Sequence, residues 1–179
     1  MLLWALVFAL AIIPSPRFVE RSSARLHALG NGLSADDLDT LANVSDVNAA
    51  ANRSVAMFLR ERVAPADPVF VWGFEPVIYD LADRDPASRF IYNVPQRVAW
   101  VKDRARVTLM RDLQARPPSA IVVEHGDVFP SVTGNTLDSA AALETFHELA
   151  RLLRDDFVLD RTIEDFDIYL RRRLTMTTD

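Results

Sequence analysis

Cysteine is absent from the 179 residues, and glycine occurs only five times. The absence of cysteine excludes disulfides, thiolate metal sites and cysteine nucleophiles, although a cysteine-free domain is compatible with either side of a membrane. The few glycines form neither the Gly-x-Gly-x-x-Gly pattern of dinucleotide-binding folds nor a Gly-x-x-x-x-Gly-Lys phosphate loop. A Gly-x-Ser-x-Gly nucleophile elbow is also missing.

Lysine is nearly absent as well, because Lys102 is the only lysine among twenty basic residues. The scattered arginines indicate a coding bias of the source rather than a phosphate-binding device. The formal net charge of −5 argues against general nucleic-acid binding. His27, His125 and His147 lie far apart and lack metal-ligand spacing. Half of the residues are hydrophobic, and the length suffices for one domain with a real core.

The first thirteen residues are uncharged and almost wholly apolar, and a Pro-Ser-Pro-Arg sequence follows them. A bilayer span needs about 20 apolar residues, so this segment alone is short. It could be the apolar region of a signal peptide, with Ala9-Leu10-Ala11 as a loose cleavage site but without a basic start. It could also be a buried helix. We favour the end of a transmembrane helix that begins upstream, because Pro14 and Arg17 resemble an exit into the membrane interface.

The rest of the chain is organised around residues 68–76. This stretch begins with an unbroken apolar run that ends at Gly73, and Glu75 and Pro76 follow the run. Such a run is typical of a strand covered on both faces. Gly73 permits a close backbone turn, and Pro76 suits the first turn of a helix. The pattern therefore predicts a strand, a tight turn and a helix, which together open an α/β unit.

Hydrophobic periodicity and breakers predict alternating helices and strands along the rest of the chain. We expect helices from 45 or 46 to 63, over 76–82, over 97–115 and from a cap at Thr136 or Asp138 to 153, and strands over 69–72, 88–94, 120–123, 157–159 and 166–170. This order predicts an α/β fold. We expect a three-layer structure with a mostly parallel sheet, helices on both faces and a C-terminal antiparallel hairpin at the edge. The predicted organisation is a transmembrane helix end over 1–16, a linker with one short helical turn over 17–45, an α/β domain over 46–173 and a frayed tail over 174–179.

Ligands of open α/β sheets bind beyond the carboxyl ends of the strands. Glu75, His125 and Asp127 follow predicted strands and are candidates for an acid/base group or a weak metal site. The favoured alternative is that Glu75 begins a helix, His125 is exposed and Asp127 caps a turn. Tyr79, with the nearby Trp72 and Phe74, could stack on a sugar, although core packing is the favoured role. For His147 a structural or solvated position is favoured.

Four phrases together carry a resemblance. They are VWGFEPVIY at 71–79, RDPASRFIY at 84–92, DL and RPPSAIVV within 112–123, and FDIYLR at 166–171. In order and spacing they resemble the soluble C-terminal domain of bacterial multi-pass glycosyltransferases. These are GT-C superfamily enzymes similar to the dolichyl-phosphate-mannose protein mannosyltransferases. The resemblance covers roughly residues 47–172.

The resemblance implies a place at the inner (cytoplasmic) membrane, with this domain on the periplasmic, extracytoplasmic side. The implied partners are the upstream transmembrane region of the same protein, a polyprenyl-phosphate-linked sugar donor and the membrane, with no nucleic acid. The family's catalytic acidic residue lies far upstream, so no catalytic residue carries over to this chain. The implied role is to cap the active site or recognise the acceptor. Glu75, Tyr79, His125 and Asp127 remain candidate substrate contacts, and no cofactor or metal is expected.

Two other hypotheses compete with this one. The first is a free-standing membrane-anchored or periplasmic α/β binding module without catalysis. The second, which is the least favoured, is a small hydrolase that uses Glu75, His125 and Asp127.

Overall fold

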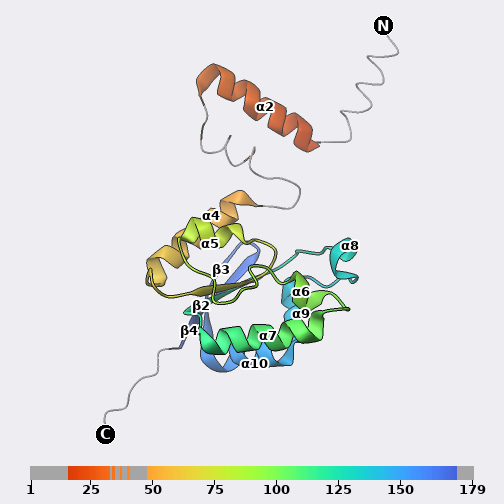
Figure 1. The fold of residues 1–179 in the computed structure, drawn as a ribbon. Coiled ribbons are helices and arrows are strands. Elements are labelled where there is room, and N and C mark those ends of the chain that lie inside the picture. The colour runs from red at the N-terminus through yellow and green to blue at the C-terminus, as the bar shows by residue number, and fades with distance from the viewer. Residues whose placement is uncertain (1–15, 33, 35–36, 38–39, 41–47, 173–179) are drawn as a thin grey trace. The chain divides into compact units, whose positions relative to one another are not determined.

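The computed structural model describes residues 16–32, 34, 37, 40 and 48–172 (Figure 1). The chain divides into two compact units, Met1–Ala50 and Ala51–Asp179. The predicted transmembrane helix end over 1–16, apart from Pro16, lies outside the described residues, as do the N-cap at Ser45 or Asp46 and the frayed tail over 174–179. Among the residues that are described, no helix is long and apolar enough to cross a lipid bilayer.

The first unit contains α2, which spans Pro16–Asn31. The sequence pattern predicted a linker with one short helical turn over 17–45, whereas residues 17–31 form several turns of continuous helix. The polar composition suggested a linker, but most of these residue types are tolerated in a helix. Gly32 follows the helix with a φ of 80°, a conformation that glycine adopts without strain and that commonly ends helices.

The second unit is an α/β domain built on one four-stranded sheet. Its elements in chain order are α4 (Ala49–Arg62), β1 (Val69–Trp72), α5 (Val77–Ala82), α6 (Val94–Arg97), α7 (Lys102–Ala115), β2 (Ala120–Glu124), α8 (Pro130–Thr133), α9 (Ser139–Glu144), α10 (His147–Asp156), β3 (Phe157–Ile163) and β4 (Phe166–Arg171). The order of strands across the sheet is β1-β2-β4-β3. Only β1 and β2 pair in parallel, whereas β4 pairs antiparallel with both β2 and β3. The sheet is therefore mixed, and the expectation of a mostly parallel sheet is not confirmed.

Both central apolar runs form strands that are buried on both faces, as predicted. Every residue of β1 and β2 is buried. Val71 and Val122 contribute to one core cluster together with residues of α4 and α5. Trp72 and Val123 contribute to a second cluster together with residues of α7, α9 and α10. Figure 1 shows α4 and α5 on one side of the strands, and α7 and α10 on the other.

The strand predicted over 88–94 is wrong. This segment is an irregular loop with Ile91 and Tyr92 at the surface. The neighbour of β1 at this edge is the chain just before residue 88, where Pro86 forms an isolated parallel bridge with Val69. Asn93 N–H donates to Gly73 O at 3.1 Å and ties the end of the loop to the turn after β1.

Two long predicted helices differ from the structure. The helix predicted over 97–115 is α7, which begins only at Lys102; the short α6 precedes it, and the backbone is extended at Val98 between them. The helix predicted to end at 153 is α9 and α10, separated at Phe146, where the backbone leaves the helical region. The cap at Asp138 is confirmed, because its side chain accepts from Ala141 N–H at 2.8 Å.

The C-terminal hairpin is confirmed, but its order in the sheet differs from the prediction. The alternating pattern of residues 166–170 suggested an edge strand. In the structure β4 lies inside the sheet between β2 and β3, and β3 forms the edge. The alternation arises because Phe166 and Ile168 point into the core cluster beneath α4, whereas Asp167 and Tyr169 point to the other face, which is only partly covered.

Candidate functional site

The carboxyl ends of β1 and β2 lie side by side, because Trp72 and Val123 are paired in the parallel register. The chain after β1 turns at Gly73, directly against Glu124, the last residue of β2. Phe74 N–H donates to Glu124 Oε2 at 2.6 Å. A Cβ atom on Gly73 would lie 2.3 Å from Glu124 Oε2 and 2.7 Å from Glu124 Cβ. Only glycine fits this approach, which agrees with the close turn predicted at Gly73.

Glu124 is a buried carboxyl group, with 7% of its surface exposed. Burial raises its pKa to about 8, and the negative charges of Asp127, Glu75 and Asp165 raise it further, against the hydrogen bond from Phe74 N–H. The sequence pattern alone did not single out Glu124 as a site residue. The signal was present, because parallel strands end at the same edge of a sheet and Glu124 ends the strand beside the Gly73 turn.

Glu75 follows the same turn and is buried beneath α4. Asn52 Nδ2, on α4, donates to Glu75 Oε2 at 2.7 Å. Both side chains are buried. The pair therefore joins the turn after β1 to the helix that covers one face of the sheet.

Asp127 forms a buried ion pair with Arg97 of α6, with Asp127 Oδ2 3.2 Å from Arg97 Nη1. Ser139, the first residue of α9, donates to Asp127 through its N–H and its hydroxyl, both at 2.5 Å. The Ser139 hydroxyl also accepts from Arg97 Nη1 at 3.0 Å and from Asn93 Nδ2 at 2.6 Å. Burial raises the pKa of Asp127 and lowers the pKa of Arg97, and their attraction opposes both shifts. This network joins α6 and the residue before it to the loop that follows β2 and to the first residue of α9.

His125 and Tyr79 lie outside this cluster. His125 is exposed, and its Nε2 lies 2.9 Å from Asp167 Oδ2 of β4. Tyr79 is buried in the core cluster beneath α4 and α5, and its hydroxyl accepts from Val71 N–H at 2.8 Å. Burial raises the pKa of the Tyr79 hydroxyl. Trp72 is also buried, so the favoured core role holds for both aromatic residues.

The four predicted site residues thus occupy three places. Glu75 and Asp127 flank Glu124, His125 lies at the surface beside β4, and Tyr79 lies in the core. Within the described part of the chain, no group of three or more His, Asp or Glu side chains is arranged to hold a metal ion. The cluster around Glu124 connects β1, β2, α4, α6 and α9, and substrate binding at the four residues stays a prediction.

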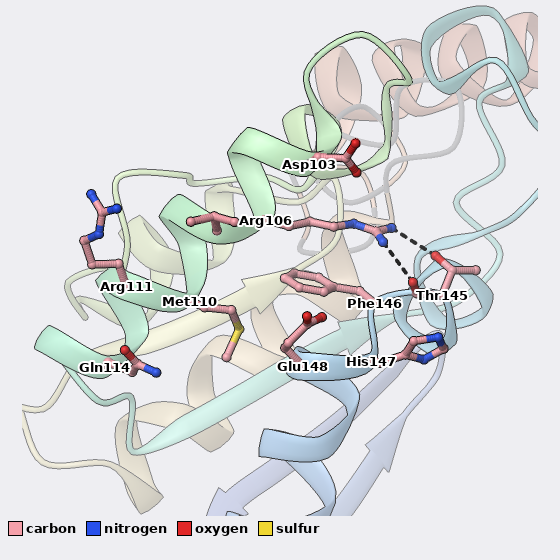
Figure 2. Close-up of a pocket in the computed structure, with 10 residues that line it drawn as sticks. Asp103, Arg106, Met110, Arg111, Gln114, Thr145, Phe146, His147 and Glu148 are labelled. Atoms are coloured by element: carbon pink, nitrogen blue, oxygen red, sulfur yellow. Dashed lines mark hydrogen bonds between the residues drawn. The ribbon is translucent and has the colours of Figure 1, made fainter.

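A second feature is an open groove between α7 and the segment that joins α9 to α10 (Figure 2), with a cavity volume of about 560 Å³. Arg106 crosses its upper end, 4.8 Å above the Phe146 ring. The guanidinium donates to Thr145 O at 2.8 Å, to Thr145 Oγ1 at 3.0 Å and to Gln96 O at 3.1 Å. His147 is exposed at the rim of the groove, in agreement with the solvated position favoured from sequence. Since three acceptors share this guanidinium, Arg106 serves to join α6, α7 and α9.

We expect Gly73→Ala to lower the free energy of unfolding by about 2–3 kcal/mol, because the new methyl group overlaps Glu124 Cβ. Urea denaturation, followed by the emission of the buried Trp72, measures the loss. A double-mutant cycle gives the control. In a Glu124→Gly background the overlap is removed, so the same substitution must cost less. An equal cost in both backgrounds would show that Glu124 is not the obstacle.

Comparison with known proteins found no matching family model, no similar curated protein and no similar solved structure.

Proposed function

We propose that this chain is the C-terminal extracytoplasmic domain of a multi-pass membrane glycosyltransferase that uses a polyprenyl-phosphate-linked sugar. In this proposal the domain caps the active site or recognises the acceptor, and the catalytic residues belong to the upstream transmembrane region of the same protein. The domain lies on the periplasmic side of the inner membrane. It is a three-layer unit, in which α4 and α5 cover one face of the sheet and α7, α9 and α10 cover the other.

One observation supports the proposal most directly: the four phrases that carry the resemblance are contiguous in the fold. Residues 71–79 run through β1, the Gly73 turn and α5, residues 112–123 run into β2, and residues 166–171 form β4. These three strands are neighbours in the sheet. The remaining phrase, 84–92, begins at the edge of β1, where Val69 N–H donates to Asp85 O at 3.0 Å. Phrases shared because of a common fold are expected to form one structural frame, whereas chance matches have no reason to do so.

The alternative is a free-standing membrane-anchored or periplasmic binding module with the same α/β domain. It shares the apolar segment 1–13 and the sheet, so neither feature separates the two. The two hypotheses differ in the product of the gene. The glycosyltransferase hypothesis predicts a protein with many membrane helices, whereas the binding-module hypothesis predicts a protein near 20.1 kDa.

Cell fractionation followed by alkaline carbonate extraction of the membranes tests the proposal. We expect the gene product to remain in the carbonate-washed membranes and to run far above 20.1 kDa. A peripheral protein and an established multi-pass protein from the same cells serve as controls. A product near 20.1 kDa that carbonate releases would refute the glycosyltransferase assignment and leave the binding module.

A further inference from the structure

Six apolar side chains are exposed at the end of the domain where β1 and β2 terminate. We call them the apolar rim: Ile91, Tyr92, Trp100, Val128, Val132 and Leu137. Trp100 is the most exposed, with 87% of its surface open to solvent. An exposed group of large apolar residues commonly marks a surface that binds a partner or a membrane.

The rim comes from two loops that the buried network holds together. Residues 90–101 contain α6, and residues 128–137 contain α8. Arg97 of the first loop donates to Leu137 O of the second, and Asn93 of the first donates to Ser139 just beyond the second. The ring of Phe129, in the second loop, lies 4.7 Å from the ring of Phe74 in the turn after β1. Figure 1 shows α6 and α8 at the same end of the domain.

The two loops carry no charge at their surface. Residues 128–137 contain no charged side chain, and the only charged residue in 90–101 is the buried Arg97. By contrast, a quarter of the whole chain is charged. A surface of this kind offers nothing to a charged partner, whereas exposed Trp and Tyr beside aliphatic side chains suit the boundary between water and lipid.

We propose that the apolar rim inserts into the interfacial layer of a lipid bilayer and orients the domain on the membrane. The proposal rests on the membrane location included in the proposed function, which the uncharged segment 1–13 also favours. Because the rim is neutral, it needs no anionic lipid. Insertion therefore occurs on zwitterionic phosphatidylcholine and resists high salt.

Tryptophan quenching in the full chain tests this insertion. The chain has three tryptophans, Trp4, Trp72 and Trp100. Trp4→Phe leaves Trp100 as the exposed one, since Trp72 is fully buried and its indole N–H donates to Ser139 O at 2.8 Å. The protein is bound to phosphatidylcholine vesicles whose acyl chains are brominated near the headgroup. We expect strong quenching of Trp100 and none of Trp72, which a variant that also carries Trp100→Phe measures alone.

A matched pair of variants separates the rim from surface apolarity in general. Val132 in the rim and Val158 on β3 are equally exposed, at 47% and 46%. Val158 pairs with Leu170, which pairs with Ala120 at the start of β2, so Val158 lies at the opposite end of the sheet. Val132→Asp should reduce the inserted fraction of Trp100 about fivefold, as expected from loss of a half-buried valine. Val158→Asp should leave it unchanged, and an unaltered urea unfolding midpoint confirms folding in both.

Vesicle flotation makes failure of this inference distinguishable from failure of the proposed function. A chain that floats with the vesicles while Trp100 stays unquenched would overturn rim insertion and leave the membrane location intact. Protection of Trp100 from aqueous iodide without quenching by brominated lipid would assign the rim to a protein partner instead and would likewise overturn the proposal. A chain that fails to float would contradict the membrane location itself.

Discussion

Replacing Arg84 with alanine should lower the free energy of unfolding by about 4 kcal/mol. The Arg84 guanidinium is buried, and it donates to four carbonyl groups at the ends of α4 and α5. These bonds run to Arg60 O at 3.1 Å, Val63 O at 2.7 and 3.2 Å, Ala82 O at 3.1 Å and Asp83 O at 2.8 Å. The last carbonyls of a helix have no partner within the helix. Without Arg84, the carbonyls of Arg60, Val63 and Asp83 lose these donors, and Ala82 O keeps only Arg60 Nε at 3.3 Å.

Two further variants make the Arg84 result specific. Arg84→Lys should recover less than half of the loss, because one ammonium group cannot reach carbonyls of both helices as the planar fork does. Arg116→Ala removes a surface arginine whose bridge to Asp85 is largely exposed, and it should cost about 1 kcal/mol at most. Urea denaturation monitored through Trp72 measures all three. A loss for Arg84→Ala no larger than that for Arg116→Ala would contradict this role.

The stability of the domain should fall by about 4 kcal/mol as the pH rises from 4.5 to 8, through Glu124 alone. The pKa of a glutamate carboxyl in the unfolded chain is 4.5, and burial raises the folded-state pKa of Glu124 to about 8. Below 4.5 both states hold the proton, so folding carries no penalty. Between these values the unfolded chain releases a proton that the folded domain retains, and above 8 the folded domain must carry the buried charge. Arg97 is a nearby cation, whereas Glu75, Asp127 and Asp165 are negative.

Glu124→Gln tests this pH dependence, since the neutral amide can still accept from Phe74 N–H. The variant should match the parent chain below pH 4.5 and exceed it in stability above pH 8. Glu144→Gln, at an exposed glutamate on α9, is the matched control and should follow the parent curve. Unfolding free energies measured at half-unit steps of pH give the three curves. Parallel curves for Glu124→Gln and the parent chain would show that Glu124 ionises in the folded domain as it does in the unfolded chain.

The strands that the sequence predicted correctly are those whose burial makes their pattern unambiguous. Residues 69–72 and 120–123 are apolar throughout because core clusters cover both faces. The run from Phe90 to Val94 is similar in composition, yet it forms a loop that leads into α6, because Pro86 already occupies the edge of β1 and Ile91 and Tyr92 face solvent. The hydrophobic pattern of one segment does not show which other segment it will pair with in the sheet. For the same reason the hairpin was predicted, but not the central position of β4.

In the candidate site, too, some residues could be identified from the local sequence and others only from the fold. Gly73 was identified from its place after an apolar run, and the structure explains it through Glu124. Arg97 and Ser139 were not identified, because each is an ordinary helix residue until the fold brings it to Asp127. His125 followed the correct strand, but its side chain points to Asp167 instead of Glu75. Proximity to a strand end is readable from sequence, whereas the direction of a side chain depends on the pairing of the strands.

The position of β4 has a consequence for synthesis on the ribosome. β1 and β2 leave the ribosome early. The side of β2 that faces away from β1 pairs with β4, and it can do so only when residues 166–171 have emerged. At a synthesis rate of about 5–20 residues per second, the interval between Glu124 and Phe166 lasts roughly 2–8 s. During that interval the nascent chain presents an apolar strand with unpaired N–H and C=O groups, the kind of edge that invites association with other chains.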